Sequence, residues 1–304
     1  MQKKVKVIIV NFNSGNLLRK CIDSLSANCD EQNFSICIVD NFSNDLSLNF
    51  LEDYQNIELI KNNENLGFSR ACNLGASNST NEYYLFLNPD TVFIEDSIKT
   101  SLDFMENDKK LAYGACGVKQ LKLDGTVQRS CTKIPTPFSM FISSIKLNFI
   151  FSSLGYEMNY WSHEDNRDVG HVIGSFYFIR SEIFHSLKGF DQRFFVYLED
   201  LDLSKRLNDY GMKVRYLSDT TMIHVGGGVS RKIKDRRLFF SLQSRVLFCE
   251  KHFSAMSNIL INLLILPLEL FLRLMANISN KEGFMEVTKG YKLFFNWYLK
   301  KRKS

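Results

Sequence analysis

The 304-residue chain lacks several features that mark common protein classes. It has seven cysteines, an odd number, and no C-x-x-C pair, so neither a disulfide framework nor a zinc site is expected and a reducing compartment fits best. The first residues, MQKKVKVIIV, contain no long apolar run, so we expect no secretion signal. The net charge of +5 is too small an excess to indicate a nucleic-acid partner.

Proline is also scarce, at 4 residues, whereas phenylalanine is abundant, at 26. A hydrophobic content of 45% and a charged content of 23% are normal for a chain with a packed core. The length allows one large domain or two ordinary ones. We find no internal repeat and no low-complexity tract.

Short apolar runs alternate with amphipathic segments in the first part of the chain. Strands are expected at 5–10, 34–40, 56–62, 83–90 and 111–119, and helices at 14–25, 43–54, 67–78 and 95–107. Such a βαβ series predicts an α/β fold with a mostly parallel central sheet and helices on both faces. Ligands of these sheets bind beyond the carboxyl ends of the strands, where Asn11, Asp40 and Asp90 lie.

The chain changes character after its first 128 residues. Residues 129–168 show no clean periodicity and contain two of the four prolines, so a long functional loop is expected. A strand that runs into a short helix is expected at 172–184, an amphipathic helix at 198–211, and a strand at 213–218 before a glycine loop. From 231 to the end the pattern is helical.

One C-terminal segment, 259–278, is very apolar but is interrupted by Pro267 and carries Glu269 and Arg273. A membrane-spanning helix needs about 18 or more apolar residues with few charges, so this segment is a borderline case. The basic residues at the chain end favour an amphipathic helix that lies in the membrane interface. The alternatives are a helix packed on the domain itself and a membrane-spanning helix.

Polar residues after the second and third strands could bind a nucleotide-sugar. Asp40 could accept a hydrogen bond from a base or a ribose, or it could form an Asx-turn. In NENLGFSRACNLG, Gly67 permits a sharp turn, and Asn65 and Asn73 could contact the ligand or satisfy the backbone. Arg70 could meet a phosphate. A capped helix is the alternative interpretation of this motif.

Two further residues could hold a divalent cation. Asp90, in FLNPDT, follows a buried strand, and a carboxylate there can hold a hard ion that bridges two phosphates. His224, in IHVGGG, lies between a strand and a glycine run. Imidazole suits Mn²⁺ better than Mg²⁺, although either can bind beside a carboxylate. A turn at Asp90 and a structural histidine are the alternatives.

The segment YLEDLDLSKRL begins an amphipathic helix with acidic residues. The helix dipole favours acids at this end, so capping is a serious alternative to catalysis. The dipole also lowers the pKa of Asp200, which keeps the carboxylate ionised and able to take a proton. Asp202, two positions on, points away from Asp200 on a helix, and we expect it to be structural.

Together these motifs resemble the inverting nucleotide-sugar glycosyltransferases of family 2, which have the GT-A fold. The resemblance is carried, in order, by VIIVNFNSG, IVDNFSND, NLGFSRACNLG, LFLNPDT, GSFYFIRSEIFHSLKGFDQRFFVYLEDLDLSKRLNDYG and IHVGGG. The chain is most similar to the rhamnosyltransferase-like branch, which builds bacterial surface polysaccharides. The resemblance predicts a catalytic domain over 1–230, with a nucleotide-sugar half at 1–118 and an acceptor half at 119–230. A helical, membrane-associating region would follow at 231–304.

The resemblance also implies roles for single residues. Asp200 would be the general base, and Glu199 would help to position the acceptor or the base. Asp90 matches the last acid of the D-x-D metal motif, whose first position here is Asn88, and His224 matches a further metal contact of some members. A Mg²⁺ or Mn²⁺ cofactor is therefore expected. The expected nucleotide-sugar site comprises Asn11, Asp40, Asn41, Asn65, Gly67, Arg70, Asn73, Asn88, Gly174 and Ser175.

By this resemblance the enzyme would move a sugar from dTDP-rhamnose or a UDP-sugar to a glycan or polyprenyl-diphosphate-linked acceptor. It would act in the cytoplasm, at the inner face of the cell membrane, without nucleic acid. An enzyme that makes nucleotide-sugars is one alternative. Such an enzyme would have a glycine-rich phosphate loop after the first strand, and VNFNSGNLLRK is not rich enough in glycine to be one. A catalytically inactive, membrane-recruited scaffold of the same fold is the other.

Overall fold

The computed structural model describes residues 3–226 and 234–301, except for the side chain of residue 263. Within these residues a ten-stranded sheet has the order β3-β2-β1-β4-β11-β6-β12-β5, with β7 beside β6 and β9 beside β12. Its first strands are β1 (Val5–Asn11), β2 (Phe34–Asp40), β3 (Ile57–Lys61), β4 (Tyr83–Leu87) and β5 (Thr91–Phe93). The others are β6 (Tyr113–Leu121), β7 (Val127–Gln128), β9 (Arg167–Val169), β11 (Phe176–Arg180) and β12 (Lys213–His224).

The sheet is mostly parallel, as predicted. Strands β3, β2, β1 and β4 pair in parallel, and β12 pairs in parallel with β6. Strand β11 lies antiparallel between β4 and β6, and β5 is antiparallel to β12. Every residue of β1 and β4 is buried, which explains why their sequences are continuous apolar runs rather than alternating ones.

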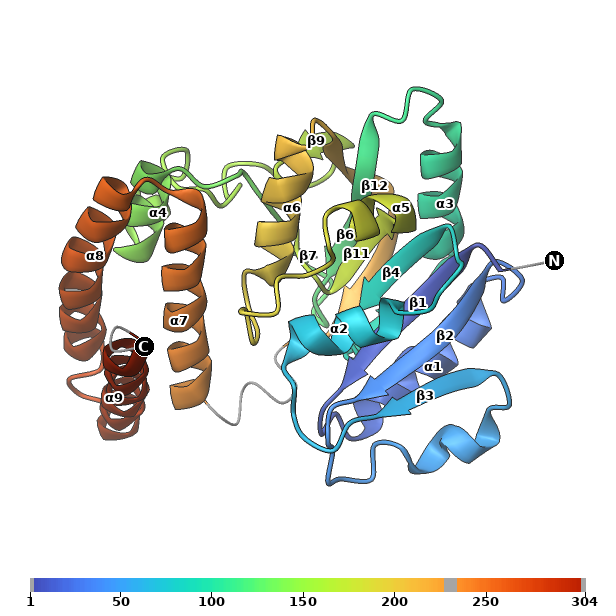
Figure 1. The fold of residues 1–304 in the computed structure, drawn as a ribbon, viewed down its shortest axis with the longest axis horizontal. Helices are drawn as coiled ribbons and strands as arrows, with labels where there is room; N and C mark the ends of the chain where they lie inside the picture. The colour runs from blue at the N-terminus through green and yellow to red at the C-terminus, as the bar shows by residue number, and fades with distance from the viewer. Residues whose placement is uncertain (1–2, 227–233, 302–304) are drawn as a thin grey trace.

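Helices cover both faces of the sheet, as Figure 1 shows. One apolar core joins the sheet to α1 (Asn16–Asn28) and α3 (Ser97–Asn107). A second core, on the opposite face, joins it to α2 (Phe68–Ala76), α5 (Ser181–Ser186) and α6 (Glu199–Asp209).

The helix expected at 43–54 is wrong, because this segment forms only the short 3₁₀ helix η1 (Asn49–Asp53). The side chain of Asp45 accepts hydrogen bonds from the backbone N–H groups of Gly15 and Ser47. Such local side-chain bonds offer the backbone an alternative to a helix, and the loop before η1 takes it.

Residues 129–168 are more ordered than their sequence indicates. They contain β8 (Cys131–Thr132), α4 (Pro137–Ser144) and the 3₁₀ helix η2 (Leu147–Phe149), and β8 pairs with β10 (His171–Val172). Thr136 and Ser139 form a capping box, and Pro137 occupies the first turn of α4. The segment crosses from the sheet to the C-terminal helices, where α4 packs against α8.

The C-terminal region contains α7 (Lys234–His252), α8 (Ala255–Ala276) and α9 (Lys281–Lys301). The expected interruption at Pro267 is wrong, since α8 continues through it. Within the bundle, Glu269 is buried with Arg245 and Arg273 at 2.6 and 2.7 Å. One apolar cluster joins α4, α7 and α8 to Leu201 of α6, so the helical region packs directly on the domain that contains the sheet.

Candidate functional site

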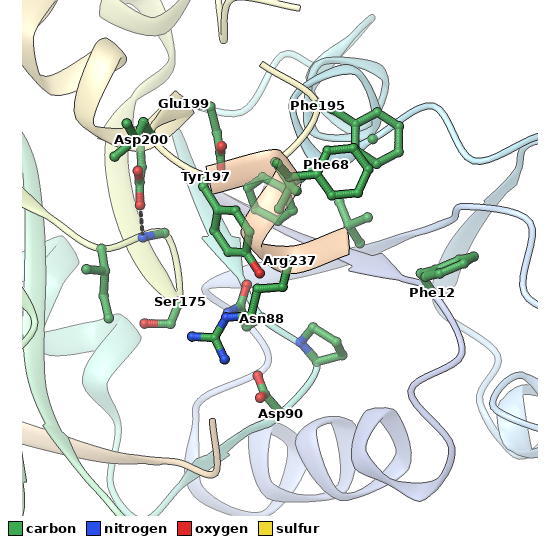
Figure 2. Close-up of a pocket in the computed structure, with 18 of the residues that line it drawn as sticks. Phe12, Phe68, Asn88, Asp90, Ser175, Phe195, Tyr197, Glu199, Asp200 and Arg237 are labelled. Atoms are coloured by element: carbon green, nitrogen blue, oxygen red, sulfur yellow. Dashed lines mark hydrogen bonds between the residues drawn. The ribbon is translucent and has the colours of Figure 1, made fainter. Parts of the chain in front are cut away.

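A pocket of about 980 Å³ opens at the carboxyl ends of β1, β2 and β4. Its walls come from the loops after these strands, the start of α6, the end of β12 and the start of α7 (Figure 2). The predicted residues that line it are Asn41, Asn65, Gly67, Asn88, Asp90, Gly174, Ser175, Glu199, Asp200 and His224. The structure therefore brings together residues from five separate sequence motifs.

Asn11 and Asp40 lie beneath this pocket rather than on its wall, since both are buried and neither lines it. The Asn11 amide donates to Asp40 at 2.8 Å and to Ser47 Oγ at 2.9 Å. Asp40 also accepts the N–H of Ser43 at 3.1 Å, which is the Asx-turn named above as its alternative role. The pair braces the loop after β2, and a contact between Asp40 and a base stays a prediction.

Asn41 holds the neighbouring loop in place. Its amide nitrogen donates to Asn65 Oδ1 at 3.0 Å and to the Gly67 carbonyl at 3.1 Å. Gly67 has a φ of +83°, and a Cβ added there would lie 2.5 Å from the Phe195 carbonyl oxygen. That oxygen accepts the N–H of Phe68 at 2.7 Å. Glycine is required at this position by both its backbone conformation and the close approach of the loop that precedes α6.

The structure does not place Arg70 or Asn73 in the pocket. The Asn73 side chain donates to the Phe190 carbonyl at 2.8 Å and accepts its N–H at 2.9 Å, so both ends of the amide are used. Arg70 is exposed on α2. We therefore leave both residues out of the proposed site.

Asp90 and His224 meet at one end of the pocket. His224 Nε2 lies 3.2 Å from Asp90 Oδ1, and both side chains are about nine-tenths buried. Backbone pairing of β5 with β12 places Thr91 opposite His224, which fixes this approach. The described residues contain no group of three or more His, Cys, Asp or Glu side chains that could hold a metal. A metal here would therefore complete its shell with ligand oxygens, as Mg²⁺ commonly does.

The second nitrogen of His224 decides whether Nε2 can bind a metal. His224 Nδ1 lies 3.0 Å from Gln128 Nε2. If the Gln128 amide nitrogen donates, Nε2 carries the proton and can donate to Asp90. With the amide turned so that its oxygen accepts from Nδ1–H, Nε2 is free to bind a cation. The donor set thus fits a divalent cation held by one carboxylate and one imidazole.

Asp200 enters the pocket from a strained turn, since Tyr197 and Leu198 before α6 have φ values of 72° and 62°. Its Oδ2 accepts the N–H of Gly174 at 2.7 Å, and its Oδ1 accepts the N–H of Leu201 at 2.8 Å. His171 Nε2 lies 3.3 Å from Oδ2. Burial alone would raise the pKa of Asp200, but His171 and the two N–H groups outweigh it and lower that pKa. Asp200 is thus held ionised.

The neighbouring Glu199 is in the opposite state. Burial, together with the adjacent charge of Asp200, raises the pKa of Glu199 well above its ordinary value. Its Oε2 has no hydrogen-bond partner among the described residues. Two adjacent carboxyl groups whose pKa values are pushed apart are typical of sites that move protons. The lowered pKa of Asp200 favours the carboxylate, which can accept a proton, and the raised pKa of Glu199 favours the carboxylic acid, which can donate a hydrogen bond.

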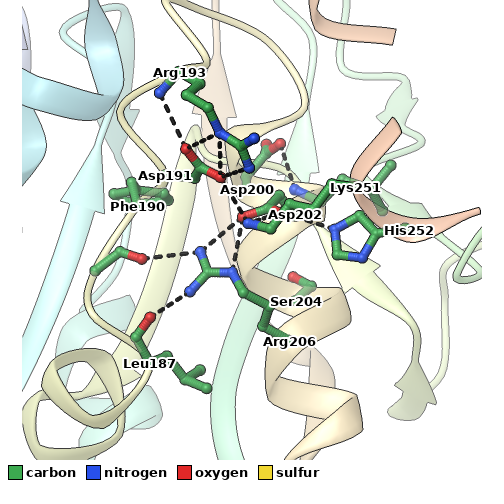
Figure 3. Close-up of polar contacts among 12 residues, drawn as sticks. Leu187, Phe190, Asp191, Arg193, Asp200, Asp202, Ser204, Arg206, Lys251 and His252 are labelled. Atoms are coloured by element: carbon green, nitrogen blue, oxygen red, sulfur yellow. Dashed lines mark hydrogen bonds and ion pairs between the residues drawn. The ribbon is translucent and has the colours of Figure 1, made fainter. Parts of the chain in front are cut away.

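Asp202 contacts a separate set of charged side chains, as Figure 3 shows. The carboxylate is fully buried and contacts Arg206 at 2.8 Å and both Lys251 and His252 at 2.7 Å. Lys251 also contacts Asp191 at 2.8 Å. These contacts support the structural role that we expected for Asp202, because they join α6 to the last turn of α7.

Sequence reasoning missed several residues that line the pocket, including His171, Phe12, Phe195, Arg236 and Arg237. Phe12 lies within a motif already quoted, and its aromatic ring was the available signal. His171 carried none, since its contact with Asp200 depends on the pairing of β10 with β8. The two arginines were assigned only to a C-terminal helix.

The chain is similar to known proteins over most of its length. The profile of glycosyl transferase family 2 matches residues 6–187. Rhamnosyltransferase WbbL of Escherichia coli (strain K12) is 27% identical over 78% of this chain and 87% of its own length. The N-acetylglucosaminyl-diphospho-decaprenol L-rhamnosyltransferase of Mycobacterium tuberculosis (strain ATCC 25618 / H37Rv) is 26% identical over 74% of this chain and 76% of its own length.

Solved structures share the fold at low sequence identity. The mannosyltransferase PcManGT from Pyrobaculum calidifontis, in complex with GDP-Man and Mn²⁺, aligns with a TM-score of 0.57 and 14% identity, over 98% of this chain and 83% of that one. GalNAc-T7 with UDP, GalNAc and Mn²⁺ aligns with a TM-score of 0.55 and 15% identity, over 73% of this chain. This chain spans only 44% of the length of GalNAc-T7.

Proposed function

Because the chain belongs to glycosyl transferase family 2, we propose that it transfers rhamnose from dTDP-rhamnose to a lipid-linked glycan during the synthesis of a bacterial surface polysaccharide. Support for the donor comes from relatives named as rhamnosyltransferases, among them the dTDP-rhamnosyl transferase RfbF of Shigella flexneri, which is 23% identical. Support for the acceptor comes from the decaprenol-linked substrate in the name of the Mycobacterium relative. A UDP-sugar is the second candidate donor.

The observation that carries the catalytic proposal is the placement of Asp200. It is ionised, fixed by Gly174 and His171, and shares one pocket with Asp90 and His224. In the proposed reaction, Asp200 takes the proton of the acceptor hydroxyl, whose oxygen bonds to the anomeric carbon. The bond from that carbon to the phosphate oxygen breaks, and its electron pair leaves with the nucleoside diphosphate. Attack from the face opposite the leaving group inverts the anomeric configuration.

Other residues of the pocket bind and orient the two substrates in this proposal. Asn41, Asn65 and Gly67 form the wall nearest the nucleotide, above the braced pair Asn11 and Asp40. Gly174 and Ser175 lie on the acceptor side, and the protonated Glu199 donates a hydrogen bond to the acceptor. A divalent cation held by Asp90 and His224 would offset the charge of the departing diphosphate.

Membrane contact is the remaining part of the proposal. Within the described residues, α8 is long and apolar enough to cross a membrane, and 29% of its apolar stretch is buried inside the protein. Its exposed apolar side chains recur at helical spacing: Leu260, Leu264, Leu268, Phe271 and Met275. Phe149, Ile150 and Phe151, from the segment that carries α4, are also exposed. We propose that this face rests in the membrane interface, where a lipid-linked acceptor is found.

The test of the proposed function is a donor screen followed by a transfer assay. The melting temperature is measured with dTDP, UDP, GDP and their sugars, with and without Mn²⁺ or Mg²⁺, because a ligand of the native state raises it. A larger rise with dTDP than with UDP, and transfer of rhamnose with inversion, are expected. A larger rise in melting temperature with UDP would indicate that the donor is a UDP-sugar. Nucleotide binding without transfer to any lipid-linked acceptor would support the inactive scaffold instead.

A further inference from the structure

The pocket carries two cationic side chains that the proposed mechanism has not used. Among its described lining residues the carboxyl groups are those of Asp90, Glu157, Glu199 and Asp200. The only Lys or Arg side chains among them are Arg236 and Arg237, both from the first turn of α7. A diphosphate-linked donor is anionic, so a pocket for it needs positive charge that this acidic lining does not supply.

Arg236 and Arg237 are exposed at the rim of the pocket and are not held by other charged side chains. Neither forms an ion pair with a described acid, whereas Arg206 and Arg245 are both paired with buried carboxylates. Cations are disfavoured at the first turn of a helix, because the helix dipole is positive there. In the same turn Lys234 contacts Glu286 at 3.3 Å and Asp235 supplies one acid, whereas Arg236 and Arg237 have no ion-pair partner among the described residues. An anion bound in the pocket would relieve this repulsion.

Arg237 also faces a place where this sequence departs from the family pattern. Asn88 stands where family 2 enzymes have the first acid of D-x-D, which leaves Asp90 as the single carboxylate of that motif. In Figure 2 the Arg237 side chain extends from α7 into the pocket, toward the side that Asn88 and Asp90 line. A guanidinium can bind two phosphate oxygens at once and is always charged.

We propose that Arg237, with Arg236 beside it, binds the diphosphate of the donor and stabilises it as it leaves. The inference rests on the proposed function of the pocket. As the bond to the anomeric carbon breaks, the diphosphate gains negative charge, and the guanidinium offsets that charge together with whatever Asp90 and His224 hold. The C-terminal helical region then completes the catalytic site, in addition to any contact with the membrane.

The attachment of α7 to the pocket supports this role. The ring of Phe240 stacks on that of Phe195, with centroids 4.6 Å apart and planes at 12°. Ser244 Oγ donates to the Val196 carbonyl at 2.8 Å. Both contacts fix α7 to the loop that leads into Asp200, so Arg237 and the proposed base are held on one connected unit.

The test measures binding of inorganic pyrophosphate, dTDP, UDP and thymidine by calorimetry, in EDTA and in Mn²⁺. Arg237→Gln removes the charge, Arg237→Lys keeps it without the planar fork, and Arg19→Gln is the matched control on α1, outside the pocket. We expect Arg237→Gln to weaken pyrophosphate and the preferred nucleoside diphosphate by about tenfold or more, in both media. Thymidine affinity and the melting temperature stay unchanged, Lys restores part of the loss, and the control binds as wild type.

The inference is overturned if Arg237→Gln binds pyrophosphate within twofold of the wild type, if thymidine affinity falls as much, or if the wild type binds no pyrophosphate. Failure of the proposed donor looks different. Suppose that the wild type prefers UDP and that Arg237→Gln loses affinity for pyrophosphate. The donor would then be a UDP-sugar, and the proposed role of Arg237 would stand. If Arg237→Gln instead transfers rhamnose and binds pyrophosphate as tightly as the wild type, the proposed donor stands and the proposed role of Arg237 is wrong.

Discussion

Replacement of Asp202 by Asn should weaken the attachment of α6 to α7 and so lower the free energy of unfolding. The carboxylate is fully buried and lies within 2.8 Å of cationic or donor groups on Arg206, Lys251 and His252. Removal of one partner from a buried ion pair leaves the other charges without compensation, which costs about 3–5 kcal/mol. That is a large share of the ~5–15 kcal/mol that stabilises a typical native protein.

The control lies on the same helix. Asp209 pairs with Lys205 at 2.7 Å, but the Asp209 side chain is 58% exposed. An exposed pair of this type contributes only about 0.3–0.5 kcal/mol, so Asp209→Asn should unfold almost as the wild type does. The assay is equilibrium urea unfolding. Trp161 contacts Tyr216 of the sheet, whereas Trp297 lies in α9, so variants that keep one tryptophan report each part separately.

The pH dependence gives a second readout. Burial opposes ionisation of Asp202, but His252, Arg206 and Lys251 prevail, and the pKa of Asp202 is lowered in the native state. The stability that Asp202 contributes is therefore fully present above its unfolded-state pKa, about 3.9. It is lost as the pH falls through the lower native value. Equal stabilities of Asp202→Asn and Asp209→Asn at neutral pH would refute this reasoning.

Three further substitutions test other parts of the account. Because the pKa of Glu199 is raised, Glu199→Gln should match the wild type in free energy of unfolding near pH 4 and exceed it increasingly as the pH rises. Urea unfolding measures this difference, and equal stability of the two proteins at neutral pH would contradict the raised pKa. Gly67→Ala should destabilise by about 1–3 kcal/mol and weaken nucleotide binding, since its Cβ would meet a backbone carbonyl oxygen at 2.5 Å. Gly125→Ala, with a similar φ and nothing within 4 Å, isolates the backbone contribution. Phe271→Asp, on the exposed face of α8, should reduce co-sedimentation with vesicles that contain anionic lipid, whereas Leu123→Asp, at an exposed position outside the C-terminal helices, should not.

Much of the fold could be predicted because its signals are local. Strands β1, β2 and β4 are buried apolar runs between polar turns, and α6 has an amphipathic pattern that ends near Gly211. The antiparallel position of β11 could not be predicted, because pairing partners depend on the whole sheet. The regular structure within 129–168 could not be predicted either, because α4 is a short helix that packs on α8, more than a hundred residues later in the chain.

Some residues of the candidate site could also be predicted from the sequence, and others could not. Asp200, Asp90 and Gly67 could be chosen from motifs, because each stands at the end or start of a recognisable element. Arg70 was chosen on the same reasoning, yet its exposed side chain on α2 does not line the pocket. His171 and Arg237 could not be found, because only tertiary packing brings β10 and α7 to the pocket.

The most direct test of the central claim compares Asp200→Asn with the wild type in transfer and in binding. The account predicts that kcat for rhamnose transfer falls by about 10²–10⁴-fold, because the proton of the acceptor hydroxyl loses its acceptor. The dissociation constant for dTDP should stay within twofold, since Asp200 contacts Gly174 and His171 rather than the wall near the nucleotide. A variant that transfers rhamnose at near wild-type rate would show that Asp200 is not the base.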